Sequence, residues 1–189
     1  MAGPDILAGV AVADEGDYAT QQLIDQTDEW FCNGGTWTVG SAGDADGLQV
    51  YCGQTGGTGT SVNITMILAD ASGNILGTTA EASWASEQWV EADFTGSDVA
   101  VTASQEVQLW YALDGGYDYM RTDGGSFAGV NDTSGSYASP PDPLDNTANY
   151  PGEGITGIRL MGTIGGAGGG ARPVPHKLHS ARMKSLLGR

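Results

Sequence analysis

The stretch from Glu106 to Asp114 carries the clearest alternation of side chains in the chain. One parity is wholly apolar: Val107, Leu109, Tyr111 and Leu113. The other holds Gln108, Trp110 and Ala112. A period of two is the signature of a β-strand, and apolar residues on both parities indicate that both faces are covered. We therefore predict a central strand that ends at Gly115-Gly116.

Shorter alternations before and after this strand predict its neighbours. Residues 62–68 and 75–82, separated by the turn residues 71–74, are typical of a hairpin with a short loop. In the run 88–94 we expect Val90, Ala92 and Phe94 to point inward and the acidic residues between them to meet water. Leu48, Val50 and Cys52 alternate in the same way.

In all, the pattern predicts about nine short strands, at a spacing typical of sandwiches and barrels. The predicted fold class is all-β, a jelly-roll-like antiparallel β-sandwich with a flexible basic C-terminal tail. An immunoglobulin-like sandwich is the alternative, but it typically has a tryptophan flanked by two partner cysteines, and that order is absent from this sequence.

The same pattern divides the chain into four parts. We expect an N-terminal arm at 1–30, the sandwich at 31–164, a glycine-rich linker at 165–171 and a basic tail at 172–189. Within the sandwich, the alternation stops from Asp123 to Gly154, which predicts a long loop that is either functional or disordered.

Charge is distributed very unevenly. The chain has 23 acidic and 7 basic residues, a net charge of −16, yet five of the basic residues lie after position 171. The tail therefore carries +5 and the rest of the chain −21. A body this acidic is repelled by DNA and by anionic membranes, so we expect neither a nucleic-acid nor a membrane partner.

No catalytic motif is visible. Both histidines, His176 and His179, lie in the tail, which excludes a Ser-His-Asp or Cys-His arrangement within the body. A pair of carboxylates of the glycosidase type is not singled out by any spacing. Asp123-Gly124-Gly125 and the run from Asp142 to Asn146 lack the spacing of a calcium loop. We predict no enzyme activity, no cofactor and no metal site.

Aromatic residues in or beside the long loop could stack on sugars. The candidates for this alternative, a glycan-binding site, are Trp110, Tyr117, Tyr137 and Tyr150. Core packing or anchoring of the loop would explain several of them equally well.

The two cysteines, Cys32 and Cys52, are open to two interpretations. If 36–39 and 48–52 formed a hairpin, the register would place the two cysteines opposite each other and allow a disulfide. Otherwise they are buried thiols.

The N-terminus lacks the basic start and long apolar segment of a secretory signal, and no stretch of the sequence is apolar enough to span a bilayer. We therefore expect synthesis in the cytoplasm.

A family resemblance rests on the rhythm of the strands and on a few local features. These are Leu48–Tyr51, Val62–Leu68, Gly73–Gly77, Gln88-Trp89-Val90, Val99–Val101, Gln108–Leu113 and Pro140-Pro141-Asp142-Pro143 before Ile158-Arg159-Leu160. Over roughly residues 36–164, this pattern resembles the jelly-roll domains of bacteriophage structural proteins and, in related form, carbohydrate-binding modules. The short basic tail after a glycine linker also looks like that of virion accessory proteins.

The resemblance implies a bacteriophage virion protein: a head decoration, fibre or tail-associated component, made in the host cytoplasm and located in the virion. Its partners would be other capsid or tail proteins. Because the edge strands of a jelly roll expose unpaired backbone groups, we expect a homo-oligomer, and family analogy favours a trimer. The tail would be the docking element, ordering only on its partner. Its expected contact residues are Arg172, His176, Lys177, His179, Arg182, Met183, Lys184, Leu186, Leu187 and Arg189.

Overall fold

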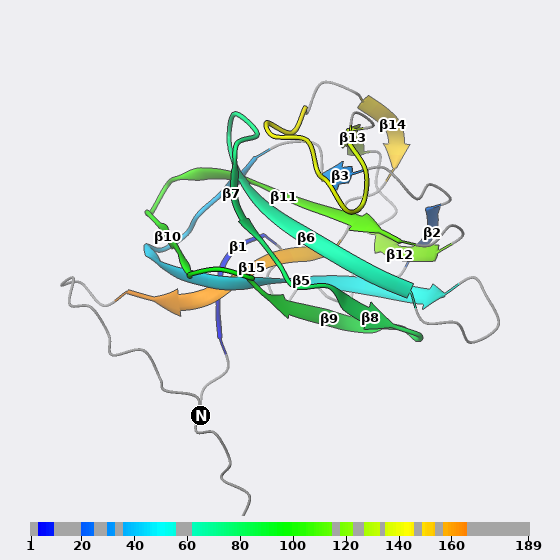
Figure 1. The fold of residues 1–189 in the computed structure, drawn as a ribbon, viewed down its shortest axis with the longest axis horizontal. Coiled ribbons are helices and arrows are strands. Elements are labelled where there is room, and N and C mark those ends of the chain that lie inside the picture. The colour runs from blue at the N-terminus through cyan, green and yellow to red at the C-terminus, as the bar shows by residue number, and fades with distance from the viewer. Residues whose placement is uncertain are drawn as a thin grey trace, which may run out of the picture.

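The computed structural model describes residues 4–9, 20–24, 30–32, 36–55, 62–114, 118–122, 127–132, 135–145, 149–153 and 157–165. Within these ranges the secondary structure consists of strands, with no helix. The strands form two antiparallel sheets packed as a sandwich, as the sequence predicts. Figure 1 shows β11 and β6 running side by side in one sheet and β5 and β15 in the other.

In the described part of the chain, the first sheet, sheet A, has seven strands. Its main path is β1 (Asp5–Gly9), β15 (Ile158–Ile164), β5 (Gly43–Thr55), β12 (Asp118–Thr122) and β2 (Thr20–Ile24). On its other side β5 pairs with β9 (Gln88–Asp93) and β10 (Val99–Val101). The long strand β5 is therefore the axis of sheet A.

The second sheet, sheet B, has eight strands among the residues that the structure describes. Its main path is β14 (Asn149–Glu153), β13 (Phe127–Asp132), β3 (Trp30–Cys32), β11 (Glu106–Leu113), β6 (Val62–Asp70) and β7 (Ile75–Thr78). In addition, β4 (Trp37–Thr38) pairs with β11, and β8 (Ala82–Trp84) pairs with β6.

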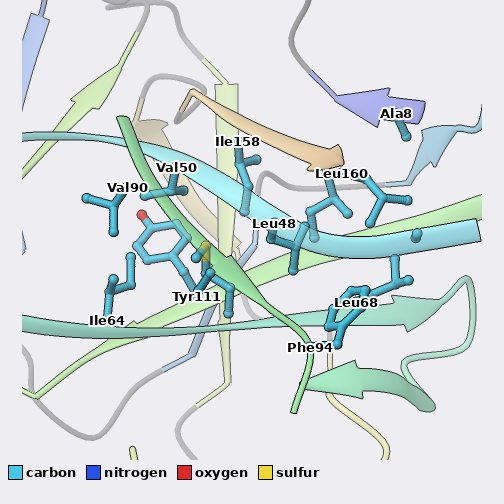
Figure 2. Packing of buried hydrophobic residues seen from close by; sticks show 14 of the residues in the cluster. Ala8, Leu48, Val50, Ile64, Leu68, Val90, Phe94, Tyr111, Ile158 and Leu160 are labelled. Atoms are coloured by element: carbon cyan, nitrogen blue, oxygen red, sulfur yellow. The ribbon is translucent and has the colours of Figure 1, made fainter. Parts of the chain in front are cut away.

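The predicted central strand is confirmed as β11, whose two faces lie in two separate clusters. Its first parity, Val107, Leu109, Tyr111 and Leu113, lies in the core between the sheets. Its second parity contributes Trp110 and Ala112 to a smaller cluster on the outer side of sheet B. In Figure 2, Tyr111 points into the space that Leu48 and Val50 of β5 share with Ile64 and Leu68 of β6.

A segment at 135–145 covers the outer side of sheet B. Leu144 is buried in the small cluster, and Tyr137 packs against it. The indole nitrogen of Trp30 donates a hydrogen bond to the carbonyl oxygen of Ser136. At the β6–β7 turn, Gly73 has a φ of +87° and its carbonyl accepts from the backbone N–H of Leu144 at 2.9 Å. A side chain at this glycine would collide with the carbonyl oxygen of Leu144, so the close approach requires glycine.

The chain bridges the two sheets along one long side of the sandwich. The backbone N–H of Ala80 donates to the carbonyl of Asp93, and that of Thr95 to the carbonyl of Thr78, each at 2.9 Å. At the other side, Gly40 donates to the carbonyl of Leu7 in β1. Because these bonds occupy backbone groups at sheet borders, they weaken the argument that bare strand edges drive oligomerisation.

Several predictions from the sequence need correction. The arm at 1–30 contains β1 and β2, which are strands of sheet A, and β3 begins within it. The expected loop from Asp123 to Gly154 contains β13 and β14. The described part of the chain has fifteen strands, more than the alternations revealed. The predicted hairpin of 62–68 with the run that starts at 75 is confirmed as β6 and β7, and the predicted strand at 88–94 is confirmed as β9.

Of the two interpretations of the cysteines, the one that requires a hairpin between 36–39 and 48–52 is wrong. β4 pairs with β11 in sheet B, whereas β5 belongs to sheet A. Cys32 and Cys52 therefore lie in different sheets, and both are buried thiols rather than a disulfide.

Candidate functional site

Among the described residues, a connected group of surface side chains lies on the outer side of sheet A around β9. Val90 and Ala92 point into the core, so Trp89, Glu91 and Asp93 point outward. The neighbouring strands add Gln49 and Tyr51 from β5 and Arg159 from β15, and the turn before β9 adds Glu87. We call these seven residues the β9 face.

Register brings the β9 face together. In the pairing of β5 with β9, Tyr51 lies opposite Trp89 and Gln49 opposite Glu91. On the other side of β5, Gln49 lies opposite Arg159. One row across three strands thus reads Arg159, Gln49, Glu91, with the aromatic pair directly beside it.

Hydrogen bonds connect this row. The Nε–H of Arg159 donates to the side-chain oxygen of Gln49 at 2.8 Å, and the amide nitrogen of Gln49 donates to a carboxylate oxygen of Glu91. Arg159 is 7% and Gln49 9% exposed, so both are held within the protein surface. Glu91 is exposed. The row therefore links a nearly buried cation to a carboxylate in solvent.

The aromatic pair stacks in the same place. The rings of Tyr51 and Trp89 lie 5.2 Å apart at 20°, and the guanidinium carbon of Arg159 lies 3.8 Å from the centre of the Trp89 ring. A cation–π contact of this kind contributes about 0.5–2 kcal/mol, depending on how far it is desolvated. Two side chains of the protein thus already pack against Trp89, which leaves less of its ring for a stacked sugar.

Carboxylates extend the β9 face toward the start of β5. Asp46 is half-buried, and burial raises the pKa of its carboxyl group, with Asp93, Asp98 and Glu91 adding to the rise by repulsion. Asp44, Asp93 and Asp98 are exposed. The surface around β9 and the start of β5 is therefore acidic. The one cation of the β9 face, Arg159, is already bonded to Gln49 and packed on Trp89.

Two of the four candidate glycan-binding aromatics serve packing. Trp110 is fully buried, and its indole N–H donates to the side-chain oxygen of Gln108 at 2.9 Å, so it lies in the core and not on a platform. Tyr137 is half-buried; its hydroxyl accepts from Thr65 at 3.0 Å and donates to Glu81 at 2.9 Å. Burial is the largest cause of the raised pKa of Tyr137. Tyr117 and the side chain of Tyr150 lie outside what the structure describes.

The ten predicted contact residues of the tail, all between Arg172 and Arg189, also lie outside the described residues. Among the residues that are described, no three histidine, cysteine or acidic side chains are grouped to hold a metal ion. The described ranges likewise contain no helix long and apolar enough to cross a membrane.

The pattern of 88–94 predicts the inward residues and the acidic outward parity, but not the β9 face as a unit. Arg159 and Gln49 are distant in sequence and meet only because β15 pairs with β5. In comparisons with known proteins, no family model and no curated sequence matches the chain.

Proposed function

We propose that this protein is a non-catalytic structural component of a virion, attached to capsid or tail proteins and presenting its β-sandwich on the particle. The observation that carries the proposal is the division of charge: a body of −21 and a C-terminal segment of +5 after a glycine-rich stretch. Such a division suits a compact body joined by a separate cationic anchor to an acidic protein surface.

The sandwich itself supports a presenting role. Its core is continuous from Leu7 in β1 to Leu160 in β15, and most of the outward parity that is described is polar or acidic. A resemblance to phage jelly-roll domains points in the same direction. The competing function, glycan binding by the aromatics of the long loop, is less favoured because Trp110 and Tyr137 are already used in packing and hydrogen bonding.

Mass spectrometry of purified virions from the source of this sequence tests the proposal directly. We expect the chain in stoichiometric amounts, and its absence from every particle would overturn the proposal. A chain ending at Gly170 should melt at the same temperature but no longer join particles. Because the anchor is electrostatic, attachment of the full chain should weaken as salt rises.

A further inference from the structure

The chain leaves the sandwich at the acidic end of the β9 face. Ile164, the last residue of β15, lies opposite Gly43, and Thr163 lies opposite Asp44. The backbone N–H of Gly165 then donates to the carbonyl of Ala42 at 3.0 Å. The segment that continues to the basic residues therefore starts beside the first residues of β5 and their carboxylates.

The β9 face is complementary to that segment in charge. Glu87, Glu91 and Asp93 are exposed carboxylates, while the cation of the face, Arg159, is nearly buried and bonded to Gln49. Burial is the largest cause of the raised pKa of Asp46, and repulsion from Asp93, Asp98 and Glu91 adds to it. A cationic partner lying across these groups would relieve the repulsion.

The face and the segment also match in their apolar parts. Tyr51 and Trp89 are half-exposed in the middle of the carboxylates. The C-terminal segment places Met183, Leu186 and Leu187 next to Arg182 and Lys184. A peptide with basic and apolar side chains side by side suits a surface on which carboxylates surround an aromatic pair.

We propose that the basic segment 172–189 docks on the β9 face of its own chain. From Asp44 to Tyr51 the face is about 23 Å long at ~3.3 Å per residue. The segment after Gly165 can extend to about 80 Å at ~3.3 Å per residue, so it reaches every part of the face. A short flexible connection gives an effective concentration in the millimolar range, roughly 1 mM, so even a weak contact is occupied within one chain, ahead of contact between chains.

This docking makes the β9 face a competitor of any external partner. While the segment lies on the face, its cations are not available to an acidic surface elsewhere. Attachment to a larger assembly would then require exchange of one acidic surface for another. Only this last step rests on the proposed virion function; the docking itself is a property of the isolated chain.

Tryptic cleavage of the intact, full-length protein tests the inference. Trypsin cuts after Lys177, Arg182 and Lys184, and a synthetic peptide of residues 172–189 in the same tube reports the activity of the protease at each salt concentration. At 0.05 M salt we expect cleavage in the protein to be about sixfold slower than in the peptide, because an effective concentration of roughly 1 mM and a Kd of ~0.2 mM leave about one sixth of the segment undocked. At 1 M salt, where screening acts over about 3 Å, the two rates should converge.

Two matched double variants locate the contact. Glu91→Gln with Asp93→Asn removes two of the three exposed carboxylates of the β9 face and should abolish the protection. Glu81→Gln with Glu106→Gln removes the same charge from sheet B, where Tyr137, Thr36 and Thr38 bond these carboxylates, and should keep it. Unchanged melting temperatures would show that both variants fold.

Three results would overturn the inference. The first is equal cleavage of protein and peptide at low salt. The second is equal loss of protection in both double variants, which would mean a response to net charge alone. The third is protection that grows with protein concentration, which would assign the segment to the face of a second copy. None of these results bears on whether the chain is found in virions.

Discussion

The polar group buried beneath the 135–145 segment offers a sharp test of the packing around β11. Gln108 is fully buried; its side-chain oxygen accepts from the indole N–H of Trp110 at 2.9 Å, and its amide donates to the carbonyl of Ala71 at 3.1 Å. Gln108→Leu keeps the volume but leaves the indole N–H without an acceptor in the core. A buried donor left unsatisfied costs about 1–3 kcal/mol. The carbonyl of Ala71, an exposed residue, can bond water instead.

We therefore expect Gln108→Leu to lower the free energy of unfolding by about 1–2 kcal/mol, after the gain from burying an apolar side chain. Trp110→Phe should cost about 2–3 kcal/mol, through a cavity and an orphaned amide oxygen. The double variant should lose about 1 kcal/mol less than the sum, because it removes both partners of the bond. Urea denaturation followed by circular dichroism measures all three.

A matched control is Gln88→Leu, the same replacement at an exposed position of β9, which should change stability by less than about 0.5 kcal/mol. If Gln108→Leu and Trp110→Phe add to within about 0.3 kcal/mol, the bond between them contributes nothing and the reasoning is wrong.

Three further outcomes are expected. Tyr137→Phe should lower the free energy of unfolding by about 1–2 kcal/mol, since it removes bonds to Thr65 and Glu81; a loss equal to that of exposed Tyr-to-Phe changes elsewhere would contradict this. Because burial raises the pKa of Asp46 above 3.8, this carboxyl stabilises the fold below that value and loses its contribution as pH rises through the folded pKa. Asp46→Asn should therefore be more stable than the natural chain at pH 7 but not at pH 3, as thermal melts would reveal. A thiol reagent should label Cys32 and Cys52 only after unfolding, without prior reduction; no labelling of the denatured chain would mean a disulfide.

The fold was predictable wherever one strand parity is apolar and the other polar. The run 88–94 is the clearest case, because burial of Val90, Ala92 and Phe94 forces the acidic residues between them to the surface. β11 was predictable for a different reason: its second face is covered by the 135–145 segment, so both parities are largely apolar over the length of a strand. In both strands the polarity of the side chains indicates whether each face is buried or exposed.

Other strands lack such a pattern of polarity. β13 and β14 contain Gly129, Gly152 and Pro151, residues that are depleted in strands, and they owe their place to pairing with β3 and with each other. β1 is short and contains an irregularity between Ile6 and Ala8, which breaks the period of two. Long-range pairing overrides local preference in these segments, and one sequence does not reveal its partners.

The β9 face and the cysteines illustrate the same limit at the level of sites. Arg159 meets Gln49 and Trp89 only because β15 and β9 flank the same strand, β5. The register that would have joined Cys32 to Cys52 assumed that strands close in sequence pair with each other. Instead, β4 pairs with β11 in sheet B while β5 lies in sheet A, so the two cysteines do not lie opposite each other. A site built from side chains on neighbouring strands therefore depends on the topology of the sheet. In a sandwich, this topology depends on which strands are joined by connections that cross from one sheet to the other.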